Sequence, residues 1–441
     1  MGPRQRWRTL LESKGENWMI KQLIKALKDT KSITGWLIDE VETNASQAFY
    51  VMQKLETKRQ VETTEYNITV YKEFSEQGVT FTGSSSFAIS HRLSLKDLNQ
   101  KIEEAAYAAS LIKNKHYDLV VGTKKRSWNQ KPFPFEPFDL LDKIAVTFFA
   151  ESKSNLRFNS FELFHTTTAN RIVSSAGVDY KKTLHRIDVE AIPSFDGEDN
   201  KVELYRFFTY TKVEFEQFKK DAQAALKDVL TRYEAKAIKN VSKADVILKD
   251  EDVRNLFVNL ISDYSYDSIY RKSTDKVIGD SIQKDVVGEY LDINLKPSSK
   301  ADAFDKDGVL LIPVKVIDKG VIASYYGSNQ YAQYLGIKPT GNLITMEVAK
   351  GKSSYAKMGR KPHLEIVALS GIQIDMYSHY IGGEVRLAIF FDGKEYHPVS
   401  GFSFSGNIET CLSNLSLSKE TTIIQGYEGP KYIVLKNMEI L

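Results

Sequence analysis

Seven histidines are the residues of this 441-residue chain whose chemistry would suit a hydrolytic metal ion. A catalytic zinc site commonly takes two histidines one helical turn apart, a third protein ligand and a water molecule. No two of these histidines lie within six residues of each other, so the sequence contains no such pair; they are His91, His116, His165, His185, His363, His379 and His397. A site assembled from His363, His379 and His397 stays open, since we expect them on different strands.

Three short motifs come close to known chemical signatures without completing them. Gly351-Lys352-Ser353 is similar to the end of a phosphate-binding loop, but Met346 stands where the first glycine is needed. The glycines and serines of 401–406 have the wrong spacing for a nucleophile elbow, and their alternation with phenylalanine favours a strand. The acidic run 305–308 lacks the EF-hand ligand pattern and predicts a hairpin turn.

Composition excludes several classes of protein. The formal net charge is only +3, which argues against a dedicated nucleic-acid binder. Cys411 is the only cysteine, so the chain can form no internal disulfide, and a reducing, cytoplasmic location is expected. No apolar run is long enough to span a bilayer. We interpret residues 1–18 as a tail, because regular helical spacing of apolar residues begins at Met19.

Two basic segments stand beside aromatic residues, a combination that can bind nucleic acid. One is Lys124, Lys125 and Arg126 with Trp128; the other comprises Lys350, Lys352, Lys357, Arg360 and Lys361 with Tyr355. We interpret both as solvated loops, and the second as a long flexible connection between two strands. A nucleic-acid-associated function remains an alternative.

Hydrophobic periodicity predicts an α+β fold. Residues 19–212 are expected to form a mixed α/β domain, with a capped helix after Ser94, and 213–240 a long connecting helix. Residues 241–441 contain many short β-type runs separated by Asp-Gly, Lys-Gly and Gly-Gly turns. Closely spaced strands of this kind predict a β-rich, mainly antiparallel C-terminal domain.

Four stretches of the C-terminal half resemble the TldD/PmbA family, whose older label is modulator of DNA gyrase. They are Ser-Ile-Tyr-Arg-Lys-Ser-Thr at 268–274 with Gly-Asp-Ser-Ile at 279–282, the segment 304–309, the glycine-containing elements of 318–342, and Val-Ser-Gly-Phe-Ser-Phe-Ser-Gly-Asn-Ile at 399–408. The third is the most specific, because it contains a Lys-Gly-Val turn, a Tyr-x-Ser element and a Leu-Gly-x-Lys-x-Thr-Gly element in order.

The family has two kinds of member, and the resemblance indicates which kind this is. TldD-type members carry H-E-x-x-x-H on a helix, and a later cysteine completes the zinc site. Here Tyr270 stands at the first histidine, Arg271 at the glutamate and Asp275 at the second histidine. Arginine stays protonated and cannot act as a general base, and tyrosine is a poor zinc ligand at neutral pH. Cys411 is outside the family's Cys-Gly ligand context, which favours a core residue.

The Tyr-Arg-Lys-Ser run is similar to the PmbA (TldE) kind, which lacks the metal. The resemblance implies no catalytic residue and no cofactor in this chain, with zinc expected in a TldD-type partner. It implies a heterodimer, or a homodimer in isolation, that encloses a chamber for unfolded peptides. The expected peptide-channel residues are Lys272, Ser273, Tyr326, Ser328, Gly401, Ser405 and Asn407. A stand-alone hydrolase with a non-standard site is the alternative.

Overall fold

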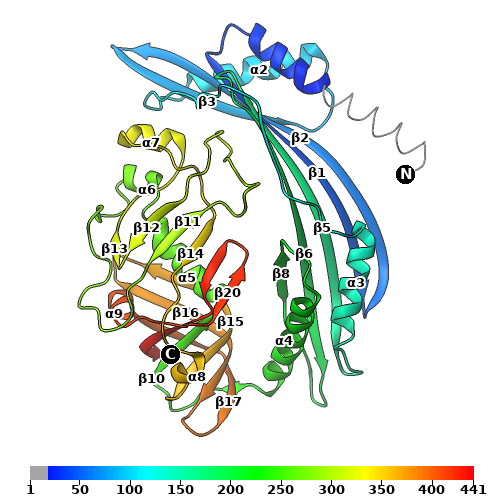
Figure 1. The fold of residues 1–441 in the computed structure, drawn as a ribbon, viewed down its shortest axis with the longest axis vertical. Helices are drawn as coiled ribbons and strands as arrows, with labels where there is room; N and C mark the ends of the chain where they lie inside the picture. Colours follow the sequence, from blue (N-terminus) through cyan, green and yellow to red (C-terminus); the bar gives the residue numbers. More distant parts are fainter. Residues whose placement is uncertain (1–17) are drawn as a thin grey trace.

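The N-terminal part of the molecule is built on one eight-stranded sheet, whose longest strands extend along most of its length (Figure 1). The computed structural model describes residues 18–441, so most of the predicted tail lies outside the described residues. The strand order is β3-β2-β1-β5-β6-β4, and β7 and β8 pair with β6. The strands are β1 (Gly35–Val51), β2 (Lys54–Glu76), β3 (Val79–Ile89), β4 (Arg126–Asn129), β5 (Leu156–Ser174), β6 (Asp179–Asp196), β7 (Lys201–Glu203) and β8 (Arg206–Tyr210).

Four helices cover one face of this sheet. They are residues 18–29, α2 (Leu95–Ser110), α3 (Pro137–Phe149) and α4 (Phe215–Glu234). Trp36 and Ile38 pack with the first two helices, and Ala48 packs with α3 and α4. Because alternate residues of a strand share a face, these even-numbered side chains of β1 place all four helices on the same side. The predicted cap of α2 is present, since the Ser94 hydroxyl accepts a hydrogen bond from the Asp97 amide at 3.1 Å.

The C-terminal part contains a barrel-like sheet. Its strands β15 (His363–Asp375), β10 (Lys243–Lys249), β22 (Tyr432–Ile440), β18 (Phe402–Asn407) and β16 (Tyr380–Phe391) pair in that order, and β16 also pairs with β15. This last pairing closes a ring of five strands. Three short strands extend it, namely β17 (Tyr396–Ser400), β9 (Lys236–Ala237) and β19 (Ser416–Leu417).

A second, six-stranded sheet lies beside this barrel, and its strand order is β13-β12-β11-β14-β21-β20. The strands are β11 (Ile293–Lys296), β12 (Val314–Asp318), β13 (Val321–Ile322), β14 (Thr345–Val348), β20 (Thr421–Ile424) and β21 (Tyr427–Pro430). The helices of this part are α5 (Glu251–Ser262), α6 (Tyr266–Tyr270), α7 (Asn329–Leu335), α8 (Tyr355–Met358) and α9 (Ile408–Ser413).

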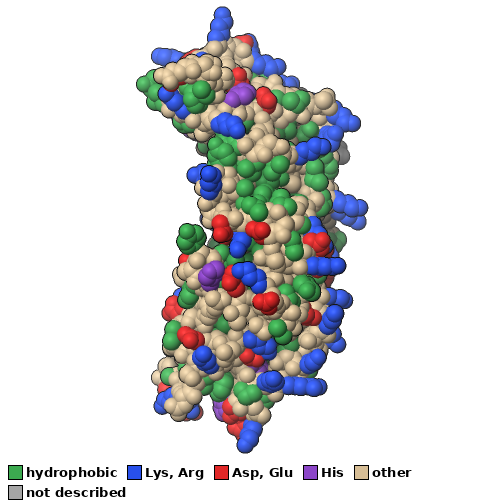
Figure 2. Space-filling view, turned by 90° about the vertical axis from the view of Figure 1, so that its left-hand side faces the viewer, with side chains coloured by type: hydrophobic (Ala, Val, Ile, Leu, Met, Phe, Trp, Pro, Cys, Tyr) green, Lys and Arg blue, Asp and Glu red, His purple; other side chains and the backbone are tan. Residues whose placement is uncertain are grey.

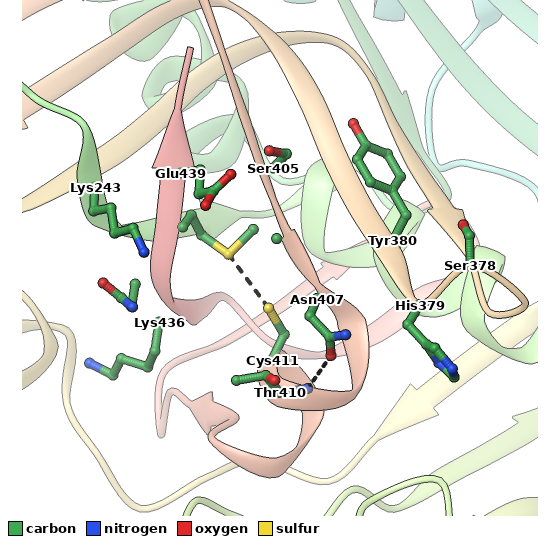
Figure 3. A pocket seen from close by; sticks show the side chains of 13 residues that line it. Lys243, Ser378, His379, Tyr380, Ser405, Asn407, Thr410, Cys411, Lys436 and Glu439 are labelled. Carbon is green, nitrogen blue, oxygen red and sulfur yellow. Dashed lines mark hydrogen bonds between the residues drawn. The ribbon is translucent and has the colours of Figure 1, made fainter.

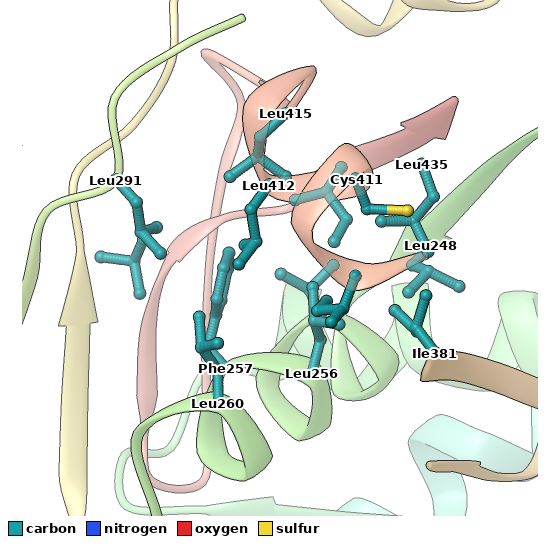
Figure 4. Packing of buried hydrophobic residues seen from close by; sticks show 14 of the residues in the cluster. Leu248, Leu256, Phe257, Leu260, Leu291, Ile381, Cys411, Leu412, Leu415 and Leu435 are labelled. Atoms are coloured by element: carbon teal, nitrogen blue, oxygen red, sulfur yellow. The ribbon is translucent and has the colours of Figure 1, made fainter. Parts of the chain in front are cut away.

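One apolar core joins the two C-terminal sheets. Leu256, Phe257 and Leu260 of α5 lie in the same buried cluster as Leu412 of α9 (Figure 4). This cluster also contains Ile293 of the second sheet. The mixed α/β fold with mainly antiparallel sheets confirms the predicted fold class. Among the described residues, no helix is long and apolar enough to cross a lipid bilayer.

The two parts meet through a loop that precedes β12. Phe304 is fully buried, and its ring lies 5.8 Å from the rings of both Trp128 and Tyr180 on the N-terminal sheet. The Lys182 ammonium lies 2.7 Å from the Asp302 carboxylate and donates to the Phe304 carbonyl at 2.6 Å. This seam fixes how the β-rich part is held against the long sheet. Trp128, from the first predicted basic segment, is therefore part of the seam.

Candidate functional site

Three of the four family-like stretches meet around α6 and α7. Ser265, just before α6, forms a parallel bridge with Tyr326, and the Tyr266 amide donates to the Tyr326 carbonyl at 2.8 Å. The loop after α6 is tied to the third stretch, because the Gly279 amide donates to the Ile322 carbonyl. The 304–309 stretch joins them, since Asp305 accepts a hydrogen bond from the Asn342 amide at 3.1 Å. Sequence elements far apart thus build one surface.

The glycine at position 327 of this surface is explained by its close packing against Tyr266. A Cβ atom at Gly327 would lie 3.0 Å from the Tyr266 ring, and the glycine has φ +148°. The Tyr266 hydroxyl continues past it and donates to the Lys338 carbonyl at 2.9 Å. A side chain at 327 would therefore push α6 away from the third stretch.

The resemblance matches Tyr270, Arg271 and Asp275 to the metal motif of TldD-type members, and these three positions are called the vacated motif below. Tyr270 and Arg271 belong to a cluster of aromatic rings and a guanidinium group. The Tyr270 ring packs against Tyr334 and Tyr331 of α7, with centroid distances of 4.8 and 5.7 Å. The Arg271 guanidinium donates to Asp267 at 2.5 Å and to the Tyr331 hydroxyl at 2.8 Å. These hydrogen bonds raise the pKa of Arg271, and the one to Asp267 has the largest effect. The side chain that the resemblance sets at the glutamate position is thus a hydrogen-bonded cation.

This cluster does not suit a zinc ion. The Tyr270 phenol belongs to a ring cluster, the Arg271 cation would repel a metal ion, and Asp275 is exposed in the following loop. Within residues 18–441, no group of three histidine, cysteine, aspartate or glutamate side chains is arranged to hold a metal ion. The side chains at these positions therefore do not form a set of zinc ligands.

The alternative metal site from three histidines is wrong. His363 begins β15, whereas His379 lies in the turn after that strand ends at Asp375. Twelve residues of extended chain span roughly 40 Å, so these two rings cannot share an ion. His397 lies on β17, where its ring is 3.1 Å from Asp392. The sequence could not reveal this, because strand pairing decides which histidines become neighbours.

The remaining predicted channel residues have varied positions. Lys272 has φ +58° at the end of α6, and the Ser273 amide donates to the Ser268 carbonyl. The Tyr326 hydroxyl donates to the Ile261 carbonyl of α5 at 3.3 Å, and burial raises its pKa to about 12. Ser328 precedes α7. Tyr326 therefore has a packing role, and the channel role of these four residues stays a prediction.

The fourth stretch lies elsewhere, at the mouth of the barrel. Ser405 and Asn407 of β18 line a hollow of about 440 Å³ (Figure 3), while Gly401 immediately precedes the strand and has φ +74°. Cys411 lines the same hollow and lies 3.5 Å from the Met438 sulfur. Burial raises the pKa of the Cys411 thiol to about 12. The thiol is thus buried and protonated, as expected for a core residue.

The second basic segment is more ordered than a flexible connection. It contains α8, the Lys352 amide donates to Glu289 at 2.6 Å, and the Tyr355 amide donates to Glu420 at 3.1 Å. The five predicted cations form no ion pair within the described part of the chain; they are Lys350, Lys352, Lys357, Arg360 and Lys361. Backbone anchors therefore hold the segment while its charges face solvent.

Sequence reasoning missed the residues that hold Arg271. Asp267 lies one helical turn before it, and Tyr331 and Tyr334 lie three residues apart on α7. This i, i+3 spacing was the available signal, since such residues share a helix face. Only the α6–α7 packing shows that both tyrosines face Tyr270.

Asp307 provides a pH-dependent test of the seam beside this surface. Burial, followed by repulsion from Asp305, raises its pKa to about 6. The folded state then binds the proton more tightly than the unfolded state, so stability falls as pH rises from about 4 to about 6. We expect Asp307→Asn to raise the free energy of unfolding by about 1–2 kcal/mol at pH 7.5, with the gain lost at pH 4.

Urea unfolding of the full chain across this pH range measures the effect. Asp199→Asn, which removes the same charge from an exposed turn, is the control. An Asp307→Asn gain that persists unchanged at pH 4 would contradict the assignment.

Comparison with known proteins places this arrangement in a family. Residues 241–441 match the model of the PmbA/TldA metallopeptidase C-terminal domain. The C-terminal part of this chain, residues 241–441, therefore belongs to the TldD/PmbA family. The matched residues include α6, α7 and the barrel, and therefore both the vacated motif and the hollow at the barrel mouth.

Two curated relatives are similar over part of their length. The chain is 27% identical to Metalloprotease PmbA of Escherichia coli O157:H7 over 185 residues, which cover 39% of this chain and 40% of that protein. It is 24% identical to a Metalloprotease PmbA homolog of Buchnera aphidicola over 210 residues, or 44% of this chain and 45% of that protein. The matched region thus covers less than half of the length of each relative.

Solved structures share the whole fold. TldE from Thermococcus kodakarensis superposes with a TM-score of 0.77 at 15% identity, covering 96% of this chain and 99% of that one. A protein named as a candidate modulator of a DNA gyrase from Thermotoga maritima superposes with a TM-score of 0.74 at 13% identity, covering 97% and 100%. At these identities the likeness shows the fold alone.

Proposed function

We propose that this chain is the non-catalytic, PmbA/TldE-type subunit of a peptidase complex. Its TldD-type partner would carry the zinc ion, and this chain would help to enclose the chamber that admits unfolded peptides. The location would be cytoplasmic, in keeping with a single cysteine. A homodimer would form when the partner is absent.

One observation carries this proposal, namely the hydrogen-bonded Arg271. Peptide hydrolysis on a metal needs ligands for the ion and a base that accepts a proton from water. At the matching place the chain has a guanidinium held by Asp267 and Tyr331, which has no proton-accepting capacity. Hydrogen bonds nevertheless hold the three family-like stretches together around Arg271, which supports a structural role in a complex.

Purification of the full chain, alone and with its native partner, tests the proposal. Alone, it should contain no stoichiometric metal by elemental analysis and should hydrolyse unfolded casein at least about 100-fold more slowly than the complex, because it lacks the general base. Co-purification from the native cell should bring a chain with H-E-x-x-x-H. Stoichiometric metal in the isolated, active chain would overturn the proposal.

A second candidate function rests on the five unpaired cations of the 350–361 segment. Phosphate contacts by such residues would give DNA binding that weakens steeply with salt. Binding that is retained at low salt and lost in a Lys350→Gln, Lys352→Gln, Lys357→Gln variant would favour this function. No binding at low ionic strength would exclude it.

A further inference from the structure

The hollow at the barrel mouth forms where two neighbouring strands separate. Strands β18 and β22 pair through Phe404 with Ile440 and Ser405 with Glu439, and Ser403 and Leu441 exchange two further backbone hydrogen bonds. At the other end of these pairs, toward Asn407 and Met438, the hollow opens between the two chains, the 378–380 turn and α9. Its volume of about 440 Å³ is within the range of small-molecule sites, which often lie in barrel mouths. No residue of α6 or α7 lines it.

Two oppositely charged, exposed side chains lie next to each other at this hollow. Lys243 and Glu439 are cross-strand neighbours on β10 and β22, and both line the hollow. Within residues 18–441 neither side chain forms an ion pair. Two other residues that line the hollow already have partners: Lys436 lies 2.7 Å from Asp245, and His379 lies 3.6 Å from Glu409.

Uncharged hydrogen-bonding groups complete the lining. The Asn407 side-chain oxygen accepts from the Thr410 amide at 2.9 Å, which leaves its NH₂ group as a donor. Ser405 and Tyr380 also line the hollow (Figure 3). At its base lie the Cys411 and Met438 sulfurs. An apolar base under several convergent polar groups is typical of a small-molecule site.

We propose that this hollow binds the zwitterion of an amino acid, either free or as the termini of a short peptide. Lys243 would bind the carboxylate and Glu439 the ammonium group, and Asn407 and Ser405 would donate to the carboxylate or, in a short peptide, to the peptide carbonyl. One cation beside one anion, both unpaired, matches a ligand that carries both charges better than a simple anion or cation. The inference goes beyond the proposed role in a peptidase complex, although Ser405 and Asn407 are also among the peptide-channel residues that the resemblance implies.

Calorimetric titration of the full chain with alanine, dialanine and N-acetylalanine amide tests the proposal. Alanine or dialanine should bind, and the blocked analogue should not, because it has neither charge. Preference between the first two identifies a free amino acid or a short peptide as the ligand. Lys243→Met and Glu439→Gln should each weaken binding at least about tenfold, the loss of one charged hydrogen bond.

Lys124→Met and Glu62→Gln make the same charge changes at exposed distant positions and should bind normally. No binding up to about 10 mM, or equal binding of the blocked analogue, would overturn the proposal.

Discussion

Lys182→Ala is expected to lower the free energy of unfolding by about 3–5 kcal/mol, because it leaves a buried carboxylate without its partner. The Asp302 side chain is only 7% exposed, and Lys182 is its single ion-pair partner within the described residues. The same ammonium donates to the Phe304 carbonyl and lies 4.7 Å from the Phe304 ring centre. One substitution therefore removes three contacts across the seam.

Urea unfolding followed by tryptophan fluorescence suits this test, since Trp128 packs against Phe304. The wild-type seam should unfold with the rest of the chain, and the variant should show an earlier fluorescence change. Lys58→Ala is a matched control, because Lys58 pairs with Asp142 at the same 2.7 Å on an exposed surface. Equal losses for the two variants would show that the seam pair contributes no more than a surface pair.

Local signals in the sequence predicted most helices well. Ser94 and the alanine-rich segment after it predicted a helix over 95–112, and α2 ends at Ser110. The predicted helix 213–240 ends earlier, at Glu234, because Ala235 is extended and Lys236 and Ala237 pair with β17. Tertiary pairing thus overrides helix propensity in its last turn. The predicted domain limits stay a prediction.

Turn signals misled at one place. Gly382-Gly383 was expected to form a turn, but both residues lie inside β16. A Cβ atom at Gly382 would lie 2.1 Å from the Tyr380 hydroxyl, and one at Gly383 would lie 3.0 Å from the Phe404 ring. These glycines therefore serve close packing, which a single sequence cannot distinguish from a turn.

The candidate site could be predicted only in part, for a similar reason. The residue types at Tyr270, Arg271 and Asp275 were sufficient to question a metal site. The partners of Arg271, the distance from His363 to His379 and the hollow lined by Lys243 all depend on which strands and helices become neighbours. The residue types indicated which chemistry was possible, whereas the distances between side chains depended on the fold.

Gln283→Met is expected to lower the free energy of unfolding by about 3–5 kcal/mol. The contacts of Gln283 hold several segments together, and no sequence motif predicts them. The side chain is 4% exposed, and its amide donates to the Leu412 carbonyl at 2.7 Å and to the Glu289 carbonyl at 3.0 Å. Its oxygen accepts from the Leu291 amide at 2.8 Å. Methionine keeps the volume but leaves three backbone groups without this partner.

The control for this prediction is Gln100→Met, which makes the same change on the exposed face of α2 and should alter stability by less than about 0.5 kcal/mol. Urea unfolding of both variants gives the comparison. Because Gln283 ties the segment before β11 to α9, its loss should also loosen the helix that carries Cys411 and speed modification of that thiol. A Gln283→Met chain as stable as Gln100→Met, with an unchanged thiol rate, would mean that water or local rearrangement satisfies the three groups and that α9 is held by its apolar contacts alone.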